Sequence, residues 1–583
     1  MSTKIIRSVA EQARSPLEEQ VPLLLEQQDD VNSTNASSVE GSSTTGSRQS
    51  TPQPLRGKIK KDGRFSFTDK YEKGSLLIAI NCVAGLSIFF FGYDQGMMSG
   101  VNNSPDYVNH MGFGYVDADG TVHVTDSAKQ GGIVAIYYFG TLIGCFIGGY
   151  LGDRIGRINS IGVGSVWAMI GAMLQATAQN AKWMSFARIL NGVGTGILNT
   201  IVPVWSAETA ETKSRGQFIA LEFTLNIFGV AAAYWLEYAL SSVGAGFSPI
   251  RWRVPIAFQI IPLFALSVII WAFPESPRWL AMDGQDEEAL YILQRLRGTD
   301  TSEAEDEFYD IVSTVELQRK NSTKVSYFRM FFGIGSGNLH LGRRVQLVIW
   351  LMIIQEWIGS AGVTVYAPTM FAKAGFSTGT SELLSGLNNI FYTLSTIVNA
   401  FTIDRIGRRW TLYWGAVGQA ITMFLAGAFS RYHELNPADA GYGGLAATSI
   451  FVYTSIFGAT WLVVPFLYPT EIFPLEVRAR GNAFGVFGWS IGNGWLTLLC
   501  PVMFDLYGYK TLYLFALVNI LTIPVVWALY PETNQRTLEE IDLLFASNSP
   551  WVWDAEKEFE RLKSQNPEIL HNAQDVPHGA PTV

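Results

Sequence analysis

Two residues of opposite charge stand inside long apolar runs of the sequence, Asp94 and Arg188. A lone charged side chain in a bilayer costs about 2.5–3.5 kcal/mol, and pairing the two removes much of that cost. A buried carboxyl that loses its partner or its water also binds a proton more readily. We therefore expect Asp94 to carry a proton and Arg188 to be its partner, with a static structural pair as the alternative.

The depths of Asp94 and Arg188 in their runs are compatible with pairing. Asp94 lies about 18 residues into the run at 74–100, or roughly 27 Å along a helix. Arg188 lies about five residues into the run at 184–205, roughly 8 Å from its start. If the two helices run in opposite directions, both residues lie at similar depth in the outer half.

A second set of charged residues lies at the ends of the runs and occurs twice. Asp-Arg-Ile-Gly-Arg stands at 153–157 and again at 404–408, and each half also has a glutamate followed by an arginine seven residues later. Carboxylates here can accept hydrogen bonds from arginines and helix N-termini. We expect a conformational latch, with topology-setting charge as the alternative, formed by Asp153, Arg154, Arg157, Glu208, Arg215, Asp404, Arg405, Arg408, Glu471 and Arg478.

The composition shows what kind of elements must position these residues. The chain has 583 residues, of which 48% are hydrophobic and only 16% charged, against about 25% charged in soluble domains. The apolar residues crowd between two polar tails, which excludes a soluble enzyme and a secreted disulfide scaffold. The net charge of −9 argues against a nucleic-acid partner. The histidines lie in tails, loops or segment edges, so we expect no metal and no cofactor.

The apolar runs are each about 20 residues or longer, the length of a membrane-spanning helix. Lysine and arginine collect on one side if both termini are placed in the cytoplasm. We predict an all-α integral membrane protein with twelve transmembrane helices at roughly 74–100, 130–151, 159–180, 184–205, 217–240, 253–273, 345–367, 383–403, 410–430, 446–468, 480–503 and 510–530.

Internal repetition divides the chain. The Asp-Arg-Ile-Gly-Arg, glutamate–arginine and Pro-Glu-Ser/Thr motifs recur in the same order at nearly constant offset, which indicates two parallel six-helix repeats. The predicted parts are a disordered cytoplasmic N-tail, an N-terminal half, a cytoplasmic linker with short helices, a C-terminal half and a cytoplasmic C-tail, at 1–73, 74–273, 274–344, 345–531 and 532–583.

Several motifs together resemble the sugar porter family of the major facilitator superfamily. They are Phe91-Gly-Tyr-Asp-Gln-Gly, Gly152-Asp-Arg-Ile-Gly-Arg, Arg188-Ile-Leu-Asn-Gly-Val-Gly-Thr-Gly, Pro274-Glu-Ser-Pro-Arg-Trp, Asp404-Arg-Ile-Gly-Arg-Arg and Pro531-Glu-Thr with Leu538-Glu-Glu-Ile. The first motif and Pro203-Val-Trp are most similar to fungal members, including glycerol–proton symporters. The resemblance implies the major facilitator fold and a multi-pass plasma-membrane carrier, not an enzyme.

The expected function is secondary active transport of a small sugar or polyol, with proton symport and alternating access. The expected partners are the solute, protons and the lipid bilayer, and the expected state is a monomer. A hexose uniporter is the alternative within the family, since yeast-type hexose facilitators keep the acid at the position of Asp94. A non-transporting nutrient sensor of the same fold is the other alternative, disfavoured by the short acidic C-tail.

The resemblance also places a substrate site and shows where this chain departs from the family. The family sequence Gln-Gln-x-x-Gly-x-Asn reads here Gln355-Glu-Trp-Ile-Gly-Ser-Ala361. Phe223 aligns with a sugar-binding glutamine and Phe466 with a sugar-stacking tryptophan. Amides suit hydroxyl groups, so these changes disfavour an ordinary hexose site. The candidate substrate residues are Gln355, Glu356, Tyr366, Asn493, Phe223, Phe466 and Glu222.

Asn102-Asn-Ser104 forms a glycosylation sequon in the first outer loop. Its position next to the membrane and the following Pro105 both disfavour modification.

Overall fold

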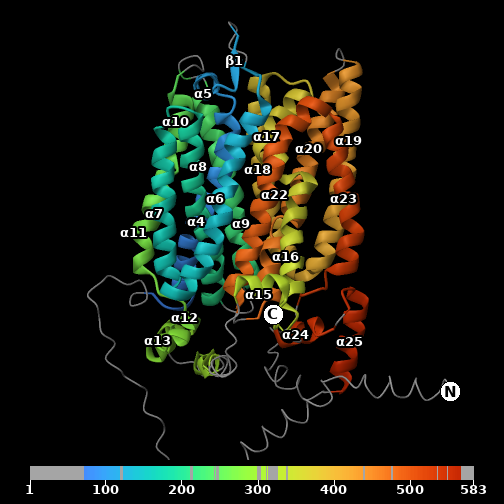
Figure 1. The fold of residues 1–583 in the computed structure, drawn as a ribbon. Coiled ribbons are helices and arrows are strands. Elements are labelled where there is room, and N and C mark those ends of the chain that lie inside the picture. Colours follow the sequence, from blue (N-terminus) through green and yellow to red (C-terminus); the bar gives the residue numbers. More distant parts are fainter. Residues whose placement is uncertain are drawn as a thin grey trace, which may run out of the picture. The chain divides into compact units, whose positions relative to one another are not determined.

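The computed structural model describes residues 71–565, except for gaps at 118–121, 211–214, 242, 244–247, 299–303, 310, 313–314, 316–325, 337–338, 437–439, 475–476, 535, 537 and 548. The predicted disorder of the N-tail therefore lies almost wholly outside the described residues. What is described is a bundle of long helices with short helices at one end and a small hairpin at the other (Figure 1).

The N-terminal half contributes six rods, of which the last is bent. They are α4 (Lys73–Val101), α6 (Ser127–Ile155), α7 (Arg157–Ala176), α8 (Ala181–Thr209), α9 (Arg215–Leu240), and α10 (Ile250–Phe258) continued by α11 (Ile260–Ile269) and η2 (Ile270–Ala272). The predicted single run over 253–273 is thus divided at Gln259. Pro255 and Pro262, on either side of that point, cannot donate backbone hydrogen bonds within the helix.

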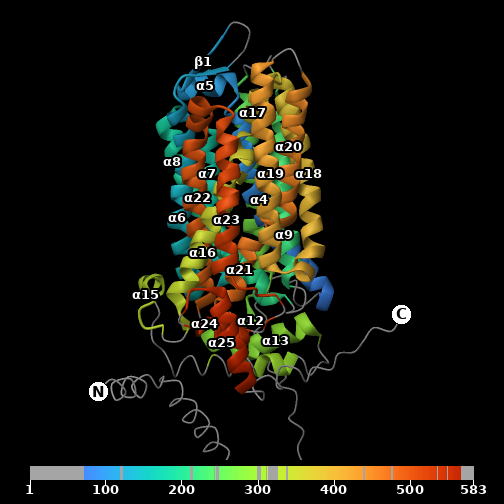
Figure 2. The same cartoon turned by 90° about the vertical axis from the view of Figure 1, so that its right-hand side faces the viewer.

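The C-terminal half contributes six more rods, two of them broken. They are α16 (Leu341–Gln355) continued by the π-turn η4 (Glu356–Ser360) and α17 (Ala361–Lys373), α18 (Thr378–Ile406), α19 (Arg408–Leu435), α20 (Ala440–Thr460) continued by α21 (Val464–Ile472), α22 (Arg478–Tyr507) and α23 (Lys510–Leu529). The two halves meet along α6 with α22, α9 with α18 and α4 with α17. Figures 1 and 2 show this packing from two sides.

Ten helical segments among the described residues are long and apolar enough to cross a membrane. The two rods outside this set are α8 and α18, each of 29 residues. Both are rich in Gly, Ser, Thr and Asn, and α8 packs against α6 and α7, and α18 against α9 and α20. These small and polar residues lower the mean hydropathy of a helix that packs against its neighbours, so composition alone does not detect it.

Short elements lie at the two ends of the bundle. At one end, α5 (Pro105–Met111) packs on the antiparallel strands β1 (Gly114–Val116) and β2 (Val122–Val124), in which Tyr115 pairs with His123. We call this the hairpin end. The other, the linker end, carries α12 (Pro277–Asp283), α13 (Asp286–Arg297), α15 (Tyr327–Phe332), α24 (Leu538–Phe545) and α25 (Val552–Gln565).

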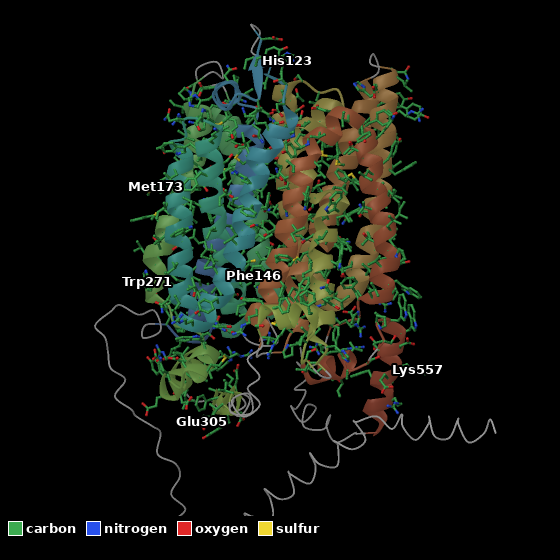
Figure 3. All side chains as sticks on the ribbon, viewed as in Figure 1. His123, Phe146, Met173, Trp271, Glu305 and Lys557 are labelled. Carbon is green, nitrogen blue, oxygen red and sulfur yellow. The ribbon has the colours of Figure 1, made fainter. Side chains whose placement is uncertain are left out.

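Side chains on the sides of the bundle are apolar, as in a protein surrounded by lipid. Met173 and Trp271 project from the bundle between its two ends (Figure 3), and both are exposed. His123 lies at the hairpin end, and Glu305 and Lys557 lie at the linker end (Figure 3). Because many exposed apolar side chains face outward along the middle, the bundle is suited to a bilayer with both ends in water.

Candidate functional site

The break in the α16–α17 rod shapes the centre of the bundle. Gly359 has φ +116, and a side chain there would also meet Met423 and the Tyr453 hydroxyl at 3.1 Å, so glycine is required. The carbonyl of Ile358 accepts hydrogen bonds from the Tyr453 hydroxyl at 3.0 Å and from Asn519 Nδ2 at 2.9 Å. Neighbouring helices thus satisfy a backbone group that the break leaves without its helical donor.

A small cavity lies at this break, between the two halves. Five of the seven predicted substrate residues line it: Gln355, Glu356, Asn493, Phe223 and Phe466. Its volume is about 30 Å³, and a single water requires about 10–15 Å³ measured in this way. The central cavity therefore holds a few waters at most, and a sugar ring requires the halves to move apart.

Two aromatic residues from opposite halves fill much of the space. The rings of Phe223 on α9 and Phe466 on α21 lie 4.3 Å apart between centroids. Ala361 also lines the cavity. The wall formed by these three residues offers a solute no hydrogen-bond partner from a side chain.

Other residues of the lining are polar. Gln355 Nε2 donates to the carbonyls of Trp461 at 3.0 Å and Leu462 at 3.1 Å, while its Oε1 has no hydrogen-bond partner among the described residues. Glu356 accepts a hydrogen bond of 2.6 Å from the Ser360 hydroxyl. Gln355 Oε1 is thus held in place and available to a hydroxyl donor.

Two predicted substrate residues lie elsewhere. Tyr366 donates to the carbonyl of Thr497 at 3.1 Å and lines a second cavity nearer the hairpin end. Glu222 accepts a hydrogen bond from the Ser206 hydroxyl of α8, and its second oxygen has no partner among the described residues. Both are buried, but neither lines the central cavity.

Further polar and aromatic residues that sequence reasoning did not single out line the central cavity, among them Gln95, Asn226, Thr364 and Trp489. Gln95 directly follows Asp94 in the Phe-Gly-Tyr-Asp-Gln-Gly motif, which was the available signal. The positions of Asn226 and Thr364 carry no such signal, because each is one of several polar residues in its apolar run.

Asp94 and Arg188 occupy the same buried region without a hydrogen bond between them. Asp94 is fully buried, and neither carboxylate oxygen has a hydrogen-bond partner among the described residues. Arg188 donates to Gln175 Oε1 and to the carbonyl of Val134, both at 3.3 Å, and lies over the Tyr137 ring at 5.0 Å. Arg188 and Tyr137 are nevertheless the groups that act electrostatically on the Asp94 carboxylate.

The predicted latch residues of the N-terminal half form one cluster at the linker end. Arg157 pairs with Glu208 at 3.0 Å. Glu275 accepts the backbone N–H groups of Arg157 and Ile158 at 2.9 and 3.0 Å. Burial raises the pKa of the Glu275 carboxyl above its ordinary value, while these N–H groups and that of Ser276 oppose the shift.

The C-terminal half repeats this cluster. Arg408 pairs with Glu471 at 2.6 Å, and Glu532 accepts the backbone N–H groups of Arg408 and Arg409 at 2.8 and 3.0 Å. In both halves the glutamate of the predicted glutamate–arginine pair binds the arginine of the other motif. Arg478 is buried, and the side chain of Arg215 lies outside the described residues.

One ion pair joins the halves at the linker end. Asp153 on α6 binds Arg480 on α22 at 3.0 Å, and Asn482 of α22 donates to the carbonyl of Thr200 of α8 at 3.1 Å. Asp153 also lies 3.9 Å from Arg157 of its own half, and Asp404 pairs in the same way with Arg408 at 2.9 Å. Arg154 contacts Tyr150 at 2.6 Å, and Arg405 is exposed.

Asn102, the predicted glycosylation site, is the C-cap of α4 and only 3% exposed. Attaching a glycan there requires the end of α4 to open locally.

Comparison with known proteins agrees with this geometry. The family model "Sugar (and other) transporter" matches residues 80–545. The Saccharomyces cerevisiae protein named "Sugar transporter STL1" is 31% identical over 514 residues, covering 85% of this chain and 86% of that protein. The Aspergillus oryzae "MFS-type transporter oryC" is 30% identical over 485 residues, covering 82% of this chain and 86% of that protein.

Solved structures show the same fold. The major facilitator superfamily proton:xylose symporter XylE, bound to 6-bromo-6-deoxy-D-glucose, superposes with a TM-score of 0.69 at 25% identity, covering 81% of this chain and 100% of XylE. One conclusion follows from the broken α16–α17 rod, from the similar clusters at the linker end of the two halves and from these matches. The chain belongs to the sugar transporter family of the major facilitator superfamily, a family of multi-pass membrane transporters and not of enzymes.

Proposed function

We propose that the chain is a proton-coupled symporter that carries a small polyhydroxylated solute across the plasma membrane by alternating access. The similarity to a protein named as a sugar transporter and to a proton:xylose symporter supports this class of solute and of coupling. We further propose that it acts as a monomer, since each chain has its own central cavity.

We propose that the linker end faces the cytoplasm and the hairpin end faces outside. The bias of lysine and arginine in the sequence supports this orientation. The halves 74–273 and 345–531 would then move against each other around the central cavity. The linker 274–344 and both tails, 1–73 and 532–583, would lie in the cytoplasm.

The observation that carries proton coupling is the state of Asp94. A fully buried carboxyl whose oxygens have no hydrogen-bond partner is costly to keep ionised. Movement of Arg188 toward or away from it changes that cost and therefore its affinity for a proton. Gln95, the next residue, lines the central cavity, so one short segment of α4 bears both the proton site and part of the solute site.

The test is Asp94→Asn, which keeps the side chain's shape but cannot titrate. We expect loss of uphill accumulation, with downhill exchange partly retained, and loss of medium alkalinisation when solute is added. The matched control is Asp117→Asn, the same change at a residue of the hairpin end that is about half exposed. Uptake of radiolabelled hexoses, pentoses, disaccharides and polyols in transporter-null cells identifies the solute.

The outcomes separate the candidate functions. No uphill accumulation and no alkalinisation by the parent would leave a uniporter. Both unchanged in Asp94→Asn would mean that the chain is a symporter whose proton site is not Asp94. No uptake of any solute by the parent at the plasma membrane would favour a sensor.

We also propose that glucose is a poor solute. Each unpaired hydroxyl buried on binding costs about 1–3 kcal/mol, so two missing partners reduce affinity roughly 30-fold or more. Phe223→Gln with Ala361→Asn adds two amides to the apolar wall of the cavity and should raise glucose affinity. Micromolar glucose affinity in the parent, or no change in a double variant that reaches the membrane, contradicts this proposal.

A further inference from the structure

A second, larger cavity lies between the halves nearer the hairpin end. Its volume is about 410 Å³, within the range of about 300–1,000 Å³ typical of small-molecule sites. Residues of both halves line it, from β2, α6 and α10 on one side and α17, α18 and α22 on the other. We call it the hairpin-end cavity. A sugar-sized solute fits here, whereas the central cavity of about 30 Å³ has no room for it.

The two cavities lie on successive parts of one segment. Thr364 and Val365 line the central cavity, while Tyr366 and Thr369 line the hairpin-end cavity. A solute that leaves one cavity along this segment therefore arrives at the other.

Gln130 gives the hairpin-end cavity an available amide. Its side chain lines the cavity and is only 9% exposed. The amide makes no hydrogen bond to any residue that the structure describes, although it has two donors and an acceptor. The amide atoms are open to the cavity, where water can reach them, and a solute hydroxyl can take the place of that water. Ser381, also buried in the lining, donates only a long hydrogen bond of 3.4 Å to the carbonyl of Phe376.

The charges in the lining are balanced. Arg251 is neutralised by Glu382 of the opposite half at 2.8 Å, and Asp505 accepts a hydrogen bond from the Ser127 hydroxyl. Both contacts join the halves across the cavity. With one cation and one carboxylate in the lining, each already engaged, the cavity favours a neutral ligand rich in hydroxyl groups over an anion or a cation.

We propose that the hairpin-end cavity is a second binding site for the neutral polyhydroxylated solute, with the Gln130 amide as its main partner and Ser381 as a secondary one. The solute class and the outward orientation rest on the proposed function. The site is occupied before the solute reaches the central cavity.

The test uses protection of a cysteine in the full-length protein. Thr369→Cys places a thiol in the cavity lining, and labelling by an impermeant methanethiosulfonate is timed with and without glycerol, D-xylose, D-glucose or D-sorbitol. We expect at least one of them to slow labelling, about threefold at twice its Kd. The chain without Thr369→Cys still contains Cys82, Cys145 and Cys500, so its labelling gives the background to be subtracted.

Matched variants show where the protection arises. Gln130→Leu in the Thr369→Cys chain should abolish it, and Ser381→Ala should weaken it. Gln179→Leu, the same change at an exposed glutamine that lies outside the cavity, should leave it intact. Labelling without solute reports that each variant is folded and at the surface.

Three outcomes overturn the proposal. The first is no protection by any of the four solutes, and the second is protection that survives both Gln130→Leu and Ser381→Ala. The third is protection that disappears when Gln355→Ala and Asn493→Ala disable the central cavity. Uptake without protection refutes only the second site. Protection without uptake refutes the proposed transport and leaves the second site standing.

Discussion

The linker ends of the two halves have the same local construction. In each, a glycine with positive φ, Gly156 at +90 or Gly407 at +93, ends one helix and starts the next. A distant glutamate, Glu275 or Glu532, then accepts the first two N–H groups of the new helix. This arrangement satisfies donors that every helix N-terminus leaves open and places a negative charge at the favourable end of the helix dipole.

The two halves differ in the partners of the aspartate that begins the repeated Asp-Arg-Ile-Gly-Arg motif. Each aspartate pairs with the arginine four residues on, Asp153 with Arg157 at 3.9 Å and Asp404 with Arg408 at 2.9 Å. Among the described residues, only Asp153 also binds an arginine of the other half, Arg480. By the offset of the glutamate–arginine motifs, the residue that corresponds to Arg480 in the N-terminal half is Gln217, which carries no charge. A duplicated motif thus stabilises both halves, but only one copy fastens them together.

The largest effect is expected from removing the buried arginine of either half. Arg157→Leu leaves Glu208 buried without its cation, which costs about 3–5 kcal/mol. Arg408→Leu should cost less, because Glu471 also accepts a hydrogen bond of 2.6 Å from the Thr533 hydroxyl. Melting temperatures of the detergent-purified variants, measured under one protocol, check the order. Equal losses would mean that the two clusters are energetically equivalent despite this difference.

The next effect concerns the two capping glutamates. Glu275→Gln and Glu532→Gln each replace one of two acceptor oxygens by an NH2 group, which leaves one helix N–H without its partner at a cost of about 1.5 kcal/mol. Burial raises the pKa of Glu275, so the stability that this carboxyl contributes is complete below its ordinary pKa. That contribution falls as pH rises through the raised value. The melting temperature of the parent should therefore fall toward neutral pH relative to Glu275→Gln, and parallel curves would contradict the expectation.

A smaller effect is expected from the pair that joins the halves. Asp153→Asn removes a partly exposed ion pair worth about 0.5–1 kcal/mol, which shifts a two-state equilibrium roughly two- to fivefold. Under the proposed orientation the shift is toward the inward-open state. Labelling at Thr369→Cys should slow, while the melting temperature stays nearly unchanged. Arg480→Gln should slow labelling as much as Asp153→Asn does, and the double variant should add nothing further. Effects that add in the double variant would argue against a direct pair.

The smallest effect is expected from Asp404→Asn. Its carboxylate is 41% exposed and pairs with Arg408 across the turn between α18 and α19, and an exposed pair of this kind contributes a few tenths of a kcal/mol. The labelling rate at Thr369→Cys should match the parent's. A shift as large as that of Asp153→Asn would show that Asp404 also joins the halves during the transport cycle.

Much of this architecture follows from local sequence. Twelve apolar runs, their repeated motifs and the glycine-containing Asp-Arg-Ile-Gly-Arg turns are local properties, because hydropathy over about 20 residues decides what can cross a bilayer. Gln355, Glu356 and Asn493, which the resemblance to sugar porters singled out as substrate residues, line one cavity. Those residues stand at family motifs, and a motif carries its place in the fold with it.

Partners across the bundle were decided by tertiary structure alone. Asp153 and Arg480 are 327 residues apart, and no periodicity in either helix indicates that they meet. The same holds for Tyr366, which lines the hairpin-end cavity, and for Asp94, which lies near Arg188 without a hydrogen bond to it. Hydropathy determines which residues enter the membrane. The rotation and depth of each helix follow instead from how it packs against its neighbours. A shift of a few ångströms is therefore enough to exchange one side-chain partner for another.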